Sequence, residues 1–89
     1  MDYQKINDTF NKVLNDNRLS LKAKGIYTII YRDILIKVTL ENFSLISKDG
    51  KTSIMAGVNE LIKYNYLKRE AIHDKDGRFI GNKYILIFE

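Results

Sequence analysis

The spacing of apolar residues changes once along this 89-residue chain, near Asn65, and this change limits the folds that the sequence can adopt. Before it, apolar residues recur three to four positions apart, which is typical of helices with one buried face. After it, Tyr66–Ile72 and Asn82–Phe88 have the pattern of strands. The region between them, His73–Gly81, contains the turn signal Asp76-Gly77. The sequence therefore predicts an α+β chain with helices first and a β-hairpin last.

Three helices are predicted before the hairpin. The first spans Leu21–Ile36, with the Ser20 hydroxyl capping its free amides. Gly25 lies within it, and because glycine costs about 1 kcal/mol in a helix we expect another part of the protein to pack close to the backbone there. The second is short and begins at Thr39, and it places on one face Leu40, Phe43 and Ile46.

The third helix follows a tight turn, Ser47–Lys51, in which Gly50 is expected to adopt a left-handed backbone. Thr52 or Ser53 should cap this helix, which runs to about Tyr64. Its apolar stripe consists of Ile54, Val58, Leu61 and Ile62, and its outward residues are Ser53, Ala56, Asn59, Glu60 and Lys63.

The order helix, helix, turn, helix, strand, wing, strand predicts a winged helix-turn-helix, which is a three-helix bundle closed by a β-hairpin wing. We expect residues 1–89 to form one domain, because the chain is short and has neither proline nor a linker-like segment. Upstream of Ser20 two additions are open. Tyr3–Ile6 suits an edge strand, and Phe10–Leu14 suits a helical turn on the core.

Composition excludes several classes of site. Without cysteine there are no disulfides, no cysteine-ligated zinc and no thiol nucleophiles, and one histidine cannot form the usual histidine-based metal cluster. No catalytic motif is present, so we expect a non-enzyme without metal or cofactor. The chain also has no signal peptide and no apolar run of the roughly 20 residues that a bilayer requires, so we expect a soluble, cytoplasmic protein.

The net charge of +4 is mild, and it divides evenly between the two halves of the chain. Charge alone therefore does not indicate a polycation that coats nucleic acid, and a binding site for anions has to come from local placement of basic residues.

Four stretches carry a resemblance to a known family. They are Leu19–Gly25, Lys48–Ile54, Leu61 leading to Asn65–Arg69, and Asp76–Arg78 before Tyr84. Together they resemble the winged-helix domain of replication initiator and replisome-organiser (DnaD-like) proteins of phages, plasmids and other mobile elements of low-GC bacteria. The resemblance spans roughly residues 6–88. It implies DNA binding in a replication module, with the third helix and the wing facing the DNA.

The chemistry of the residues favours contact with phosphates over readout of bases. Amides at the start of the third helix, with Lys51, Thr52 and Ser53 beside them, suit an anion. The outward face of that helix offers for base readout only Asn59 and Lys63. Basic residues around the hairpin, with the exposed Phe79 at the wing tip, suit a strand whose unpaired bases stack on aromatic rings. The residues expected to contact DNA are Lys51, Thr52, Ser53, Asn59, Lys63, Lys68, Lys75, Arg78, Phe79 and Lys83.

For the same residues a plain alternative stays open, in which they form a solvated surface with an ordinary helix cap. Three functions are also kept. The first is DNA binding of low sequence specificity, including single strands. The second is an interaction module for a replication enzyme, or a homodimer formed through Ile85 and Ile87. The third is a sequence-specific regulator of transcription. Ile85 and Ile87 lie on the face of the last strand opposite Tyr84, Leu86 and Phe88, and either the N-terminal segment or a second copy of the chain should cover them.

Overall fold

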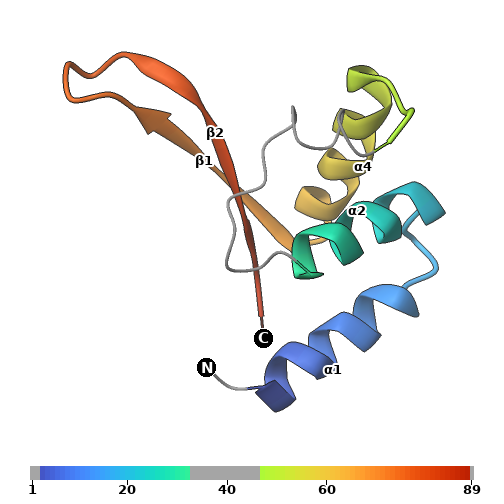
Figure 1. Cartoon of the computed structure of the whole chain (residues 1–89). Helices are drawn as coiled ribbons and strands as arrows, with labels where there is room; N and C mark the ends of the chain where they lie inside the picture. Colours follow the sequence, from blue (N-terminus) through green and yellow to red (C-terminus); the bar gives the residue numbers. More distant parts are fainter. Residues whose placement is uncertain (1–2, 33–46, 89) are drawn as a thin grey trace.

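A computed structural model describes residues 3–32 and 47–88. In chain order these residues form α1 (Tyr3–Leu14), α2 (Leu21–Arg32), α4 (Lys51–Lys63), β1 (Leu67–His73) and β2 (Phe79–Leu86). The two strands pair antiparallel into a hairpin that leans away from the helices (Figure 1). The predicted α+β class is confirmed, and the layout is compatible with a winged helix. The short helix predicted from Thr39 lies outside the described residues.

The N-terminal segment is a helix of three turns, so the predicted edge strand at Tyr3–Ile6 is wrong. The predicted helical turn at Phe10–Leu14 is the second half of this helix. Its buried face consists of Ile6, Thr9 and Val13, which are three to four positions apart. Thr9 tolerates burial because its hydroxyl donates a hydrogen bond to the carbonyl of Lys5 (2.9 Å). Because the polar residue Thr9 lies in the middle of the apolar stripe, the spacing of apolar residues alone does not predict this helix.

α2 begins where the sequence predicted. The Ser20 hydroxyl accepts a hydrogen bond from the Ala23 amide (3.1 Å), which confirms the cap. Among the described residues, no atom beyond the backbone of α2 itself lies within 4 Å of the place where a Cβ of Gly25 would stand, so the close approach expected there is not seen. The close approach is at Gly57 of α4, where a Cβ would come within 2.5 Å of Ile26 Cδ1. Gly57 therefore lets α4 pack tightly against α2.

α4 begins at Lys51, two or three residues earlier than predicted. Gly50 is the residue before the helix, with extended angles (φ −74°, ψ 163°), so its expected left-handed backbone is wrong. Its carbonyl accepts the Ile54 amide at 3.0 Å. Thr52 and Ser53 consequently lie inside the first turn and do not cap it. The bond to the Gly50 carbonyl begins the helical ladder, but the first amides of α4 have no capping side chain.

The core lies between the helices and the base of the hairpin. Tyr27, Val58 and Leu61 are fully buried, and Tyr66 and Leu67 join the hairpin to the same cluster. Burial of such side chains is the main favourable term in folding, at roughly 25 cal/mol per Å² of apolar surface. Within the predicted stripe of α4, Ile54, Val58 and Leu61 are buried, whereas Ile62 is half-buried.

The hairpin is longer than predicted, because β2 begins at Phe79 and not at Asn82. His73 pairs with Phe79 and Ile72 pairs with Gly81, so Ile80 is an extra residue in a β-bulge. The charged residues and glycines of this stretch are typical of a long loop. For this reason the sequence pattern places the start of β2 too late. At the other end of the hairpin the Ile87 amide donates to the Tyr66 carbonyl (3.1 Å).

Candidate nucleic-acid interface

The first turn of α4 is the best anion site among the predicted contacts. It carries Lys51 and has no acidic residue, and Gly50 has no side chain with which to cap the turn. Lys51 and Thr52 are exposed, and Ser53 is half-buried. The amides of this turn stand at the positive end of the helix dipole, so an incoming phosphate would find hydrogen-bond donors and a cation together.

The middle of α4 is poorly suited to recognise DNA bases, because its polar side chains form hydrogen bonds with other residues of the protein. Asn59 accepts a hydrogen bond from the Arg69 guanidinium (2.9 Å). Glu60 accepts from the amide and the hydroxyl of Ser20 at 2.8 and 2.7 Å. These two bonds lower the pKa of Glu60. Glu60 therefore joins α4 to the start of α2 and does not simply face outward as predicted. Lys63, at the end of α4, is exposed, with its ammonium 5.4 Å from the Tyr64 ring.

The two faces of the hairpin carry different side chains. Arg69 and Tyr84 pair across the strands and face α4, since Arg69 contacts Asn59 and the Tyr84 hydroxyl lies 4.0 Å from the Met55 sulfur. Residues alternate between faces along a strand, so Lys68 and its neighbours on the opposite face point away from α4.

On that far face Glu70 pairs with both predicted lysines. Its carboxylate lies 3.0 Å from the Lys68 ammonium and 3.5 Å from the Lys83 ammonium. Lys68 chiefly, and Lys83 secondarily, lower the pKa of Glu70. The predicted contacts are thus not brought onto one surface, and Lys68 and Lys83 are partly neutralised. Arg69 was missing from the predicted set, and its position opposite Tyr84 in the strand pattern was the signal that could have found it.

The turn of the hairpin is held by hydrogen bonds and ion pairs. The Asp74 carboxylate accepts hydrogen bonds from the amides of Asp76 and Arg78, both at 2.9 Å. The Arg78 guanidinium forms ion pairs with Asp74 and Asp76, both at 3.3 Å. Gly77 supplies the positive φ (82°) that the turn requires. Lys75 is exposed, and Phe79 is exposed as predicted.

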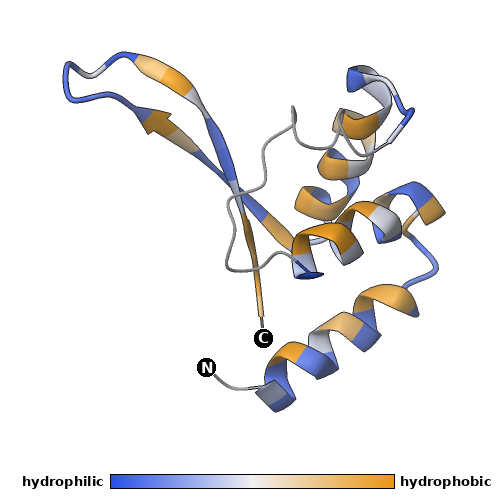
Figure 2. Ribbon diagram, in the orientation of Figure 1, coloured by the Kyte–Doolittle hydropathy of each residue, from blue (hydrophilic) through white to orange (hydrophobic). Residues whose placement is uncertain are grey.

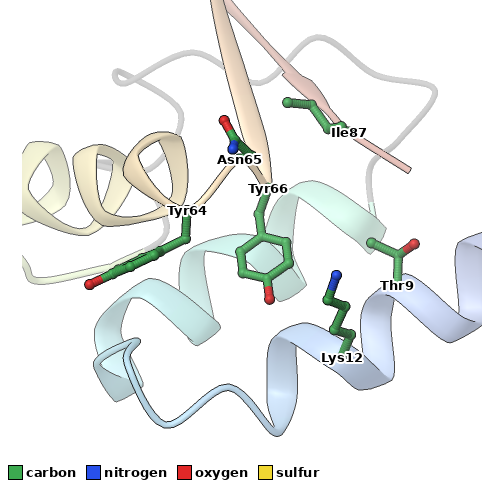
Figure 3. A pocket seen from close by; sticks show the side chains of 6 residues that line it. All are labelled: Thr9, Lys12, Tyr64, Asn65, Tyr66 and Ile87. Carbon is green, nitrogen blue, oxygen red and sulfur yellow. The ribbon is translucent and has the colours of Figure 1, made fainter. Parts of the chain in front are cut away.

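A small pocket lies between α1 and the base of the hairpin, next to the C-terminal end of α4 (Figure 3). Its volume is about 220 Å³, and Lys12 extends into it with its ammonium 5.9 Å from the Tyr66 ring. The lining residues are Thr9, Lys12, Tyr64, Asn65, Tyr66 and Ile87. Ile87 therefore shares the pocket with residues of α1, whereas Ile85 stays 37% exposed. The N-terminal segment thus approaches Ile87, and Ile85 is left to solvent.

Next to this pocket, Asp16 ties the link between α1 and α2 to the hairpin. It accepts hydrogen bonds from the Arg18 guanidinium (2.6 and 2.9 Å) and from the Tyr66 hydroxyl (2.7 Å). Arg18, and then Tyr66, hold the pKa of Asp16 well below its usual range. Arg18 also covers one face of Tyr64, with its guanidinium 4.3 Å from the ring centre. Neither Asp16 nor Arg18 was predicted, because nothing local in the sequence connects them with Tyr66.

Two kinds of feature are missing from residues 3–32 and 47–88. No three acidic or histidine side chains gather there as metal ligands, and no helix there has the length and apolar character to cross a membrane. Comparison with known proteins finds no matching family model, no matching curated protein and no matching solved structure.

Proposed function

We propose that this chain is a winged helix-turn-helix protein that binds DNA with low sequence specificity, including single-stranded DNA, in the replication module of a phage, plasmid or similar mobile element. DNA binding is supported mainly by the arrangement of helix α4 next to a hairpin that projects away from the helices. The first turn of this helix presents Lys51 and free amides, without an acidic residue or a capping side chain. The replication setting rests on the sequence resemblance alone.

Low specificity follows from the contacts of α4. Base recognition in the major groove requires side chains that are free to donate to or accept from base edges. Asn59 is bound to Arg69 and Glu60 is bound to Ser20, so the two polar residues in the middle of the helix are occupied. This arrangement disfavours the third function, a sequence-specific regulator, and leaves phosphate contact as the main source of affinity.

Fluorescence anisotropy with labelled oligonucleotides tests the proposal. We expect binding to single-stranded and duplex DNA of unrelated sequences with similar affinity, and a steep loss of affinity as salt rises, because phosphate contacts release counterions. No binding to either form at low salt would refute DNA binding. A single duplex sequence bound about a thousandfold more tightly than the others would instead establish a sequence-specific regulator.

The second function, an interaction module, is favoured by one observation. Ile85 is 37% exposed on the far face of the hairpin, beside the Lys68–Glu70 ion pair. Light scattering over a range of protein concentrations distinguishes this role. A dimer that an Ile85→Ser change abolishes, with no salt-sensitive DNA affinity, would support the interaction module over DNA binding.

A further inference from the structure

The distal end of the hairpin exposes two adjacent apolar side chains. Phe79 is 60% exposed and Ile80 is 63% exposed. Figure 2 shows an apolar segment at the start of β2, on the part of the hairpin that stands away from the helices. Exposure of large apolar side chains to water is unfavourable. Because Phe79 and Ile80 are adjacent, they form a small apolar patch at the end of the hairpin that could contact a partner.

The β-bulge lies at this point of the hairpin. Because His73 pairs with Phe79 and Ile72 with Gly81, two residues of β2 oppose one residue of β1. In a regular strand Phe79 and Ile80 would point to opposite faces, and the extra residue breaks this alternation. Gly81 completes the bulge with a φ of 149° that other residues rarely adopt. Bulges commonly redirect side chains next to functional sites.

The turn beyond these residues is closed by backbone and side-chain hydrogen bonds. The Asp74 amide donates to the Arg78 carbonyl (2.9 Å), and the Gly77 amide donates to the Asp74 carbonyl (3.0 Å). Side-chain bonds from Asp74 reinforce the same turn. A tip that is already ordered loses little conformational entropy when it enters a binding partner.

We propose that the hairpin tip is a wedge that inserts Phe79 and Ile80 among the bases of DNA. This inference rests on the proposed function and specifies how the protein engages DNA. Apolar side chains that enter a base step partly unstack it and bend the duplex, and aromatic rings stack on unpaired bases. Both actions are independent of sequence, in agreement with the occupied side chains of α4.

The charges of the turn are compatible with nucleic acid as the occupant of this apolar tip. The two carboxylates of the turn, Asp74 and Asp76, are both paired with Arg78, so their repulsion of phosphates is reduced. Lys75 is exposed in the same turn and can approach the phosphates that flank an opened base step.

The test compares Phe79→Ala/Ile80→Ala with Leu21→Ala. Leu21 is 86% exposed at the start of α2, so its change removes a similar exposed apolar side chain away from the hairpin. The probes are duplex and single-stranded oligonucleotides that carry a fluorescent aminopurine, whose emission rises when it is unstacked. Anisotropy gives affinity in the same samples, and circular dichroism checks that each variant is folded.

We expect the wild-type protein to raise aminopurine emission in the duplex, and Leu21→Ala to do the same. The double variant should still bind with a salt-dependent affinity, but at least about fivefold more weakly to single strands and without the rise in emission. Phe79→Trp, which keeps an aromatic ring, should retain both properties.

Three outcomes would overturn the wedge. If the double variant binds as tightly as the wild-type protein and neither changes the emission, the tip does not enter the base stack, while DNA binding stands. If the wild-type protein does not bind DNA at all, the proposed function fails together with the wedge. If light scattering shows a dimer that only the double variant disrupts, the tip is a surface for a second copy of this chain.

Discussion

The hydroxyl of Tyr27 is a polar group inside the described core. It is buried and has no hydrogen-bond partner among residues 3–32 and 47–88. The ring itself is well packed, with Phe10 6.2 Å away and Tyr66 edge-on at 6.5 Å. Burial, with the nearby Tyr31 and Tyr66, raises the pKa of Tyr27 to about 12. The side chain therefore stabilises the fold through its ring and not through its hydroxyl.

From this we expect Tyr27→Phe to leave the free energy of unfolding unchanged or to raise it by about 1 kcal/mol, because it removes an unsatisfied buried group.

The pH dependence of the free energy of unfolding should change as well. Above the ordinary value of 10 the unfolded chain loses this proton before the folded protein does, so the wild-type protein loses stability as pH rises from 10 toward about 12. Urea denaturation at neutral and alkaline pH measures both effects. Tyr3→Phe, at an exposed site, is the control, and a loss of 1 kcal/mol or more in Tyr27→Phe at neutral pH would contradict the expectation.

Ser20 and Glu60 form a second residue-level contact with a measurable consequence. Ser20→Ala removes the cap of α2 together with a partner of Glu60, and should lower the free energy of unfolding by about 1 kcal/mol. Since the folded protein lowers the pKa of Glu60, its contribution is present above the ordinary value of 4.5 and is lost as pH falls below it. Glu60→Gln should flatten this part of the acid profile in urea titrations.

Thr28→Ala is the matched control for Ser20→Ala. The Thr28 hydroxyl only donates to the Lys24 carbonyl within the same helix (2.8 Å), so its removal should change stability by less than about 0.5 kcal/mol. Equal effects of the two changes would show that the Ser20 cap is not specifically stabilising.

Among the elements, those governed by local signals could be predicted and those governed by packing could not. Ser20 starts α2 through a bond to its own first turn, and the period change near Asn65 marks the hairpin. α1 was missed because Thr9 interrupts its apolar stripe, although its hydroxyl is satisfied locally. The residues that pack against a glycine in a helix depend on which helices meet, and the sequence does not show this. For this reason the sequence points to Gly25, whereas the close contact is at Gly57.

The two glycines give a paired test of helix packing. Gly25→Ala should raise the free energy of unfolding by about 0.5 to 1 kcal/mol, because the site is open and alanine favours the helix. Gly57→Ala should lower it by about 1 kcal/mol, since its Cβ would collide with Ile26 Cδ1 and overpacking outweighs the helix preference.

Ile26→Val removes the colliding atom, so the combined variant Gly57→Ala/Ile26→Val should be more stable than the sum of the two single changes predicts. Thermal or urea denaturation of the wild-type protein, the two single variants and the combined variant completes this cycle. Strict additivity would show that the Ile26 side chain does not limit the approach of α4 to α2.

At the scale of the whole molecule, the sequence revealed how many basic residues surround the hairpin but not which of them are paired. Glu70 lies between Lys68 and Lys83 only because the strands pair in this register. The Asn59–Arg69 bond likewise depends on the angle at which the hairpin leaves α4. The predicted lysines are therefore divided between α4, which carries Lys51 at its start and Lys63 at its end, and the far face of the hairpin, which carries Lys68 and Lys83.

This division predicts which side the DNA contacts. Lys51→Gln/Lys63→Gln should weaken DNA binding and reduce the salt slope of log affinity by about 1 for each phosphate that the variant no longer neutralises. Lys68→Gln/Lys83→Gln removes the same charge but acts on cations already shared with Glu70, so its effect on affinity and on the slope should be much smaller. Anisotropy titrations over a salt series compare the two pairs at equal net charge, which separates position from total charge. A larger decrease in affinity for the far-face pair would place the DNA across Lys68 and Lys83, and α4 would then not be the helix that faces it.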